Sequence, residues 1–272
     1  MPPLESGRGG YTLISMNLFY LIFYQPLLNI LILLYQYLPG HDFGVAIIFL
    51  TILIRILFYP LTSQTIKSQK ALEGFQSKIR EIQEKYKKNK EEQAKAMMEF
   101  YQKEKVNPFS GCLPLLIQLP ILIALYQVFQ KGLAIEEMTN LYSFVPQPTQ
   151  INPFFLGILN LIQPNLVLAI LAGIFQFLQT KMTIPKNSKT ERKEIPTARF
   201  SQMMQKQMLY FFPFFTFLFL WRLPAAIALY WLVTTLLSII QQYLIFKPRT
   251  PEGKPSASYG AGKASLGTGQ EI

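Results

Sequence analysis

The sequence predicts an all-α polytopic membrane protein with five core transmembrane helices, an N-terminal interfacial helix and a cytoplasmic antiparallel helical hairpin. Half of the 272 residues are hydrophobic and only 15% are charged, well below the roughly 25% of an average soluble domain. Several apolar runs approach or exceed the ~20 residues that a helix needs to cross a bilayer. One long polar segment between two of these runs repeats its apolar residues with helical spacing.

The composition excludes several classes of function. The formal charge of +11 comes largely from basic residues between the apolar runs, which is typical of cytoplasmic loops rather than of a nucleic-acid surface. Cys112 is the only cysteine and His41 the only histidine, so neither an intramolecular disulfide nor a conventional zinc site is expected. The sequence carries no Ser/His/Asp set, phosphate-binding glycine loop or HExxH string. We therefore expect a protein that is not an enzyme and that uses no cofactor or metal.

The N-terminal part is expected to lie on the membrane rather than across it. Residues 1–11 are short and polar, and 12–43 form the interfacial helix and the turn that follows it. Polar residues interrupt the apolar run, and only about 13 residues separate Pro26 from Leu38, which is short for a span. The tyrosines of this segment suit the membrane–water boundary. A true span is the alternative, and it would move the N-terminus to the inside.

The first core span, 44–63, contains a charge in its interior. Its apolar run begins at Gly44 and contains one charged residue, Arg55. In a helix, Arg55 lies roughly 16 Å along the axis from Gly44. Arginine cannot lose its proton in proteins, and insertion scales assign it ~2.5–3.5 kcal/mol at the centre of a span. The rest of the chain has to explain why this cost is tolerated.

The polar segment 64–107 predicts a cytoplasmic hairpin of two antiparallel helices. Its first half repeats apolar residues at spacings of three and four, as in a coiled-coil seam. These residues are Leu72, Phe75, Ile79, Ile82 and Tyr86, and a second helix carries Ala94, Met97, Met98 and Tyr101. A solvated charged loop is the alternative interpretation.

The remaining segments alternate between apolar spans and polar connections. They are a second span at 108–131, an extracytoplasmic loop at 132–162, a third span at 163–182, a cytoplasmic loop at 183–200, a fourth span at 201–222, a fifth span at 223–246 and a disordered cytoplasmic tail at 247–272. Lysine and arginine are concentrated in the 64–107 and 183–200 segments and in the tail. The excess of positive charge on cytoplasmic segments then predicts an N-terminus outside and a C-terminus in the cytoplasm.

Arg55 is the leading candidate for a functional residue, because the five predicted spans contain no Asp or Glu. Ionisable residues inside spans are functional by default, and a polar cavity open to the cytoplasm would let this charge attract a polar or acidic segment. A structural role, in which Arg55 bonds carbonyls of neighbouring helices, is the alternative. Gln118, Gln176 and Gln179 either line the same cavity or form hydrogen bonds between helices.

Long strings in the chain resemble the YidC/Oxa/Alb family of membrane protein insertases. The resemblance runs from about Phe23 to Phe246 and is strongest in LIRILFYPLT at 53–62, EKVNPFSGCLPLLIQLPILIALY at 104–126 and IIQQYLI at 239–245. Weaker strings are FLQTKM at 177–182 and LPAAIALYW at 223–231. Only about 40 residues precede the Arg55 span, so we expect a bacterial YidC-type member without the large periplasmic domain.

The resemblance implies a groove that is open to the cytoplasm and to lipid, with Arg55 as its single arginine and Trp231 on its wall. It implies that a polar segment of a nascent membrane protein enters the groove without ATP hydrolysis, while the hydrophobic segment slides along 44–61 and 163–182 into lipid. The implied partners are nascent membrane proteins and the bilayer, with the Sec translocon, the ribosome and the signal recognition particle receptor as further candidates. The implied location is the bacterial inner membrane.

Two alternative functions remain at this point. A small-anion channel or transporter would use Arg55 as its binding site, although no internal repeat of the kind common in transporters is found. A structural scaffold would use the hairpin to recruit a partner.

Overall fold

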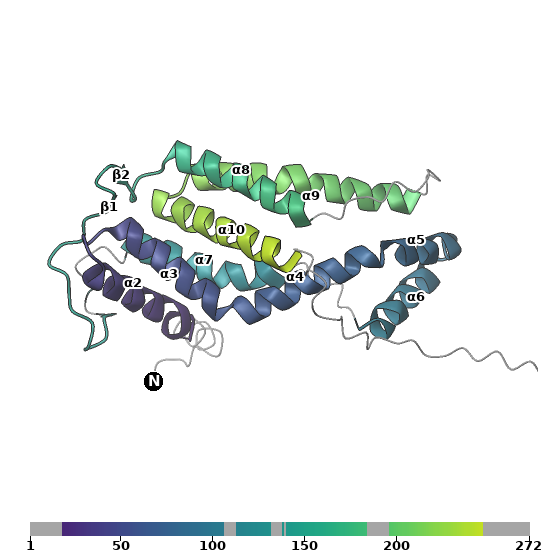
Figure 1. The fold of residues 1–272 in the computed structure, drawn as a ribbon, viewed down its shortest axis with the longest axis horizontal. Helices are drawn as coiled ribbons and strands as arrows, with labels where there is room; N and C mark the ends of the chain where they lie inside the picture. Colours follow the sequence, from purple (N-terminus) through teal and green to yellow (C-terminus); the bar gives the residue numbers. More distant parts are fainter. Residues whose placement is uncertain (1–17, 106–112, 132–137, 139, 184–195, 247–272) are drawn as a thin grey trace, which may run out of the picture.

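The computed structural model describes residues 18–105, 113–131, 138, 140–183 and 196–246 (Figure 1). The predicted flexible N-terminus at 1–11, the tail at 247–272 and Cys112 lie outside these residues. The described part is mostly helical. Its elements are η1 (Tyr20–Tyr24), α2 (Gln25–Tyr37), α3 (Phe43–Leu57), α4 (Tyr59–Gly74), α5 (Gln76–Lys85), α6 (Lys90–Lys103), α7 (Leu113–Lys131), β1 (Phe154–Phe155), β2 (Leu159–Asn160), α8 (Leu166–Thr183), α9 (Pro196–Trp221) and α10 (Ala225–Phe246).

The predicted uninterrupted helix over 44–63 is divided at Phe58. Helices α3 and α4 meet there at an angle of 65°, and Phe58 itself has left the helical region (φ −90°, ψ 4°). The cause is Pro60, because proline has no N–H to donate to the carbonyl oxygen of Ile56, four residues earlier, and its ring clashes with that carbonyl in a continuous helix. Thr62 bonds back through its hydroxyl to the carbonyl oxygens of Phe58 and Tyr59. Arg55 therefore lies in the last turn of α3, directly before the bend.

Helix α4 leads away from the other helices to α5 and α6, which lie against each other (Figure 1). The side chain of Asn89 caps α6 by accepting hydrogen bonds from the backbone N–H groups of Glu91 and Glu92. The rings of Phe75 and Phe100 meet edge to face, with centroids 5.5 Å apart. Phe100 was absent from the predicted seam. The predicted Tyr101 is half-buried, and this burial raises the pKa of its phenol.

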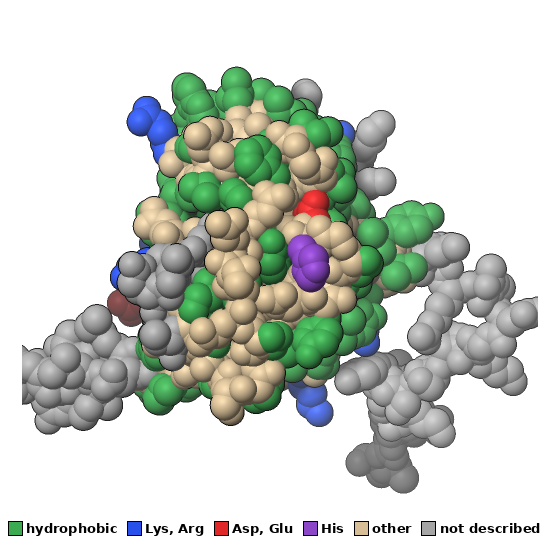
Figure 2. Space-filling model, turned by 90° about the vertical axis from the view of Figure 1, so that its left-hand side faces the viewer, with side chains coloured by type: hydrophobic (Ala, Val, Ile, Leu, Met, Phe, Trp, Pro, Cys, Tyr) green, Lys and Arg blue, Asp and Glu red, His purple; other side chains and the backbone are tan. Residues whose placement is uncertain are grey.

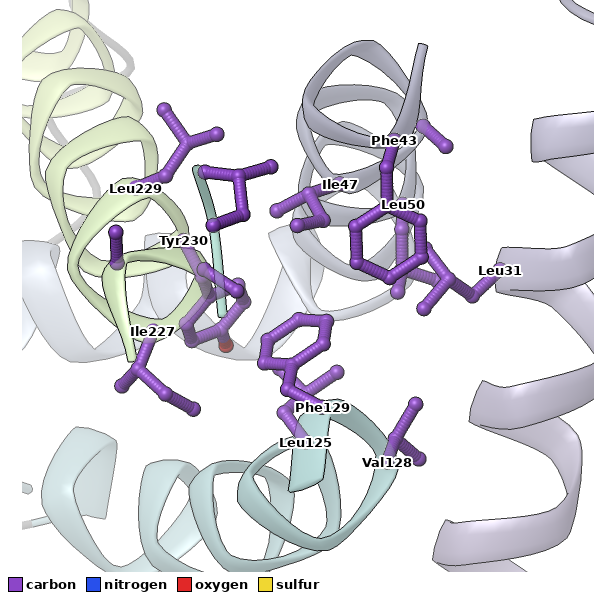
Figure 3. Packing of buried hydrophobic residues seen from close by; sticks show 14 of the residues in the cluster. Leu31, Phe43, Ile47, Leu50, Leu125, Val128, Phe129, Ile227, Leu229 and Tyr230 are labelled. Atoms are coloured by element: carbon purple, nitrogen blue, oxygen red, sulfur yellow. The ribbon is translucent and has the colours of Figure 1, made fainter. Parts of the chain in front are cut away.

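Helices α2, α3, α7 and α10 supply most of the buried apolar core, and the part shown in Figure 3 lies at the end of the molecule that carries β1 and β2. Figure 3 shows side chains from α2, α3, α7 and α10 converging on one another. The labelled residues, all buried, are Leu31, Phe43, Ile47, Leu50, Leu125, Val128, Phe129, Ile227, Leu229 and Tyr230. Each fully buried large apolar side chain stabilises the fold by about 1.5–3 kcal/mol relative to exposure to water.

The connection after α7 covers this end of the helices. Residues predicted as an extracytoplasmic loop contain β1 and β2, a two-residue antiparallel ladder that pairs Phe154 with Asn160 and Phe155 with Leu159. The all-α prediction missed this ladder, because two residues per strand leave no periodic signal in the sequence. The start of α10 is tied to the same connection, since the N–H groups of Ala225 and Ala226 donate to the carbonyl oxygens of Gln163 and Leu161.

The N-terminal helix is attached to this connection by polar groups. Asn29 is buried, with an exposed fraction of 2%. Its side-chain oxygen accepts the backbone N–H of Tyr142 at 2.6 Å, and its side-chain nitrogen donates to the carbonyl oxygen of Gln25 at 2.8 Å. The hydroxyl of Tyr35 accepts the N–H of Asn152 at 2.9 Å. Such long-range hydrogen bonds explain why polar residues occur within the apolar run of this segment.

The described helices differ in whether they could cross a membrane by length and composition. Three are long and apolar enough, namely Tyr20–Tyr37, α8 and α10, and the bent pair α3–α4 would be a fourth. Two shorter apolar helices cover Leu116–Lys131 and Leu209–Trp221. The helix from Tyr20 continues through Pro26, which sits in the first turn of α2, so the spanning alternative for this segment stays open. The count of five core spans stays a prediction.

Gly44 is required where α3 meets β1. A Cβ atom built on Gly44 would lie 2.6 Å from the Cβ of Phe155, and it would meet the ring of Phe155 as well. We predict that Gly44→Ala lowers the free energy of unfolding by about 1–3 kcal/mol, the usual cost of overpacking. Thermal unfolding in detergent measures the effect. The matched control is Gly74→Ala, because a Cβ at Gly74 meets nothing within 4 Å. Equal loss of stability in both variants would contradict the predicted clash.

Candidate functional site

Helix α10 changes character along its length. It contacts α3, α4, α7, α8 and α9, and in Figure 1 it lies between α3 on one side and α8 with α9 on the other. Its first six residues, Ala225 to Tyr230, are all buried, and five of them are aliphatic. Beyond them the buried side chains are polar: Thr235, Ser238, Gln241 and Gln242. One helix therefore carries the apolar core at one end and a polar face at the other.

Arg55 meets this polar face directly. A terminal guanidinium nitrogen, Nη2, donates to the carbonyl oxygen of Thr234 at 2.6 Å and to the hydroxyl of Ser238. The side chain is half-buried, and its Nε is buried without a hydrogen-bond partner among the described residues. These bonds satisfy part of the guanidinium but do not neutralise it, because a carbonyl and a hydroxyl carry no charge.

Gln118 joins α7 to α10 near the same point. Its side-chain nitrogen donates to the hydroxyl of Tyr230 at 2.8 Å, and Tyr230 is 1% exposed. A buried hydroxyl without a hydrogen-bond partner is costly. The bond from Gln118 removes this cost, so Tyr230 can be buried at the edge of the apolar core. The structure shows the bond from Gln118 to another helix, and a place for Gln118 in the lining of a cavity stays a prediction.

Gln176 and Trp231 join α8 to α10. The indole N–H of Trp231 donates to the side-chain oxygen of Gln176 at 3.0 Å. The side-chain nitrogen of Gln176 in turn donates to the side-chain oxygen of Gln179 at 3.2 Å. Three of the five residues singled out in the sequence therefore form one hydrogen-bonded chain. Because Trp231 follows Tyr230, this chain and the bond from Gln118 meet α10 at consecutive residues.

Two further glutamines of α10 were not singled out as site residues. The side-chain nitrogen of Gln241 donates to the hydroxyls of Thr62 and Ser63 on α4, at 2.9 and 3.0 Å. The side-chain nitrogen of Gln242 donates to the hydroxyl of Thr183 at the end of α8, at 3.3 Å. Both glutamines are buried. Through these contacts α10 connects α4 with α8. Along α10 they lie beyond the contacts of Arg55, farther from the apolar core.

A sequence signal for this face did exist. Tyr230, Thr234, Ser238 and Gln242 follow one another at intervals of four, which places them on one side of a helix. Four of the five predicted site residues contact α10 or belong to it. The fifth, Gln179, is connected to α10 through its hydrogen bond with Gln176. Arg55 itself reaches α10 through Thr234 and Ser238 rather than through the predicted glutamines.

This arrangement holds a positive charge at the boundary between an apolar core and a polar face. The apolar segments of the chain contain no acidic residue, so no carboxylate from these segments neutralises Arg55. The chemistry of such a site is attraction and hydrogen bonding rather than covalent change.

Comparison with known proteins identifies the family. The family model described as "60Kd inner membrane protein" matches residues 33–252. A relative from Fusobacterium nucleatum with the name "Membrane protein insertase YidC" is 36% identical over 206 residues, which are 76% of this chain and 87% of that protein. This chain belongs to the YidC/Oxa/Alb insertase family. It is accordingly a multi-pass membrane protein, and the family resemblance inferred from the sequence is confirmed.

Relatives with the same name differ in length from this chain. The protein from Geobacter metallireducens is 37% identical over 225 residues, which are 82% of this chain but 36% of that protein. The chain thus spans about a third of the length of several curated relatives that it matches. A solved structure described as "Active YidC insertase crystal structure with the first transmembrane domain resolved" has 24% identity and a TM-score of 0.48, covering 88% of this chain and 47% of that one.

The bond between Gln118 and Tyr230 yields a stability prediction. In Tyr230→Phe the side chain of Gln118 loses its partner inside the bundle, and we expect the free energy of unfolding to fall by about 1–3 kcal/mol. Chemical unfolding of the purified protein in detergent measures this change. Tyr243→Phe is the control, because Tyr243 lies on the same helix and is 58% exposed. Combining Tyr230→Phe with Gln118→Leu should cost less than the sum of the two single changes. Strict additivity would argue against the bond.

Proposed function

We propose that this protein is a membrane protein insertase and chaperone. It moves short polar segments of nascent membrane proteins through a hydrated, cytoplasm-open groove and releases hydrophobic segments into the bilayer without ATP hydrolysis. The observation that carries the proposal is Arg55, a charge held against α10 in a set of apolar helices without acidic residues. The relatives from Geobacter metallireducens and Fusobacterium nucleatum, both named membrane protein insertase YidC, support the insertase activity.

The groove in this proposal is lined by Arg55, Gln118, Gln176, Gln179 and Trp231, with the buried polar residues of α10 as its rear wall. A polar segment that enters exchanges water for these hydrogen-bonding groups instead of for lipid, so its transfer costs less. An acidic tail gains most, because it meets a positive charge that no carboxylate of the apolar segments neutralises.

The hydrophobic segment of the substrate leaves along α3 and α8. Both helices present exposed apolar side chains: Phe49, Leu53 and Ile56 on α3, and Ile170, Ile174 and Leu178 on α8. Because α10 contacts both helices, a segment that passes between α3 and α8 would run along the polar face of α10. These apolar surfaces support a path that keeps a nascent span beside lipid while its polar end remains near Arg55.

The membrane arrangement is proposed with five core spans. They are the bent pair α3–α4, then α7, α8, α9 and α10, while η1 and α2 form the interfacial helix. Two long helices, one bent pair and two shorter apolar helices of suitable composition support this count. Helices α5 and α6 form a hairpin in the cytoplasm, and the N-terminus lies outside. The bacterial inner membrane is the proposed location, in agreement with the family description.

The proposed partners are nascent membrane proteins and the lipid bilayer. The Sec translocon, the ribosome and the signal recognition particle receptor are further partners in this proposal. The surface of α5 and α6 carries exposed charges of both signs, including Lys78, Lys85, Glu91 and Lys95, which supports contacts with water-soluble partners rather than with lipid.

Reconstituted vesicles test the role of the arginine. We expect Arg55→Ala to reduce insertion of a single-span substrate with a short acidic tail at least about tenfold, equivalent to ~1.4 kcal/mol. Arg55→Lys should retain part of the activity, because the charge remains although the planar fork is lost. Protected fragments after protease treatment of the vesicles report insertion.

Two controls separate charge from structure. Arg222→Ala removes an exposed arginine after α9 and should leave insertion unchanged. Ser238→Ala removes one bond of Arg55 but keeps the charge, so it should lower stability more than insertion. Equal insertion by Arg55→Ala and the unmodified protein would refute the groove-charge mechanism. Chloride flux that disappears in Arg55→Ala would instead indicate a small-anion channel.

A further inference from the structure

After Glu137 the connection between α7 and α8 has the composition of a membrane surface rather than of a water-exposed loop. From residue 138 to residue 180 the chain contains no Asp, Glu, Lys, Arg or His. Several large apolar side chains in its non-helical part are nevertheless exposed. We call them the apolar cap: Phe144 (70%), Phe154 (38%), Leu156 (66%), Ile158 (85%) and Ile162 (49%).

Hydrogen bonds hold the cap against the ends of α3 and α10. The backbone N–H of Leu156 donates to the carboxylate of Asp42 at 2.5 Å, and the other oxygen of that carboxylate accepts the N–H of Val45 at the start of α3. Leu156 and Gly157 form the turn between β1 and β2 with positive φ angles of 52° and 69°, a conformation that an aliphatic residue rarely adopts. The exposed side chains of Leu156 and Ile158 are therefore presented by a turn that is bonded to the start of α3.

The shortness of α3 leaves room for such a surface in the bilayer. Helix α3 has 15 residues and is about 22 Å long at 1.5 Å per residue, which falls short of the ~30 Å of a hydrocarbon core. The chain continues into α4 only after a bend of 65°. The cap lies beyond the N-terminus of α3, so it lengthens the apolar side of the molecule where α3 begins.

Neighbouring residues at the same end are typical of a membrane interface. Tyr37 at the end of α2 is 72% exposed and Trp221 at the end of α9 is 44% exposed. The guanidinium of Arg222 lies 5.8 Å from the centroid of the Trp221 ring. Aromatic residues gather where the bilayer meets water. Figure 2 looks onto this end, where hydrophobic and uncharged polar groups form most of the visible surface that is described.

We propose that the apolar cap is a lipid-binding surface that enters the boundary between headgroups and acyl chains in the leaflet at this end. Lipid is the occupant that fits, because the cap is uncharged and continues the apolar surface of helices that cross the membrane. The cap then offsets the shortness of α3 and fixes the depth of this end in the membrane. This proposal rests on the family's membrane location and not on the insertase mechanism.

An environment-sensitive fluorophore tests the proposal in vesicles of phosphatidylcholine and phosphatidylglycerol. The probe is attached to Ile158→Cys or, as a second cap position, to Ile162→Cys, each in a Cys112→Ser background of the full chain. The matched control is Thr149→Cys, an exposed polar position in the same connection. We expect emission at both cap positions to shift to the blue. A nitroxide near the top of the acyl chain should quench them several-fold more strongly than the control.

The opposite pattern would overturn the proposal. Quenching by aqueous iodide that is as strong at Ile158 and Ile162 as at Thr149 would mean that the cap lies in water. The probe could also be protected from both iodide and the lipid nitroxide. If this protection is lost when the protein is diluted with lipid, the cap binds a second copy of the chain. Neither result would affect the Arg55 experiment, because insertion and probe depth are measured separately.

Discussion

The fold is organised around a guanidinium that cannot give up its charge. In water an arginine is solvated on all sides, but among apolar helices each of its N–H groups needs a protein acceptor, water or a ligand. Arg55 takes a carbonyl oxygen and a hydroxyl from successive turns of α10. These bonds connect two helices that are far apart in the sequence, since Arg55 and Thr234 are separated by 179 positions. The contact thus fixes how α3 and α10 lie together, and it leaves the positive charge in place.

The remaining polar contacts follow from this position. Beyond Tyr230 the buried face of α10 cannot be packed with aliphatic side chains alone, because it must lie beside a charge. Gln176, Gln241 and Gln242 each bond across to another helix or receive such a bond. Amide side chains suit this role, because they donate and accept without adding a second charge. The polar face is therefore held together by hydrogen bonds whose strength depends little on pH.

The two ends of the molecule differ for the same reason. At the end that carries β1 and β2, the core is apolar and is covered by a connection bonded to Asn29, Tyr35 and Asp42. At the other end, α4 bends away at Phe58, and the contacts of α10 are polar. Under the proposed function, the first end blocks passage and the second admits substrate. Under the proposed lipid contact, the first end also sets the depth at which Arg55 lies in the bilayer.

Much of the helical content could be predicted from the sequence alone, together with the prominence of Arg55 and the family. Apolar runs of about 20 residues and a lone charge are local features that need no knowledge of the fold. Gln118, Gln176 and Gln179 were singled out because polar residues in apolar runs are conspicuous, and Trp231 because of the family resemblance; their place in a groove stays a prediction. Their pairing could not be derived, since helical spacing shows which residues share a face but not which face of another helix they meet.

Only the tertiary structure decided the rest. In the sequence, Asn29 only interrupts an apolar run. In the fold its buried side chain accepts a hydrogen bond from the backbone N–H of Tyr142. Gly44 is an ordinary small residue until Phe155 packs on it. Ser238 gains its role only because Arg55 lies opposite. The sequence by itself determined which segments avoid water and where the unpaired charge lies, since both depend on residue type along one chain. The partners of that charge depend on contacts between distant segments, which packing alone selects.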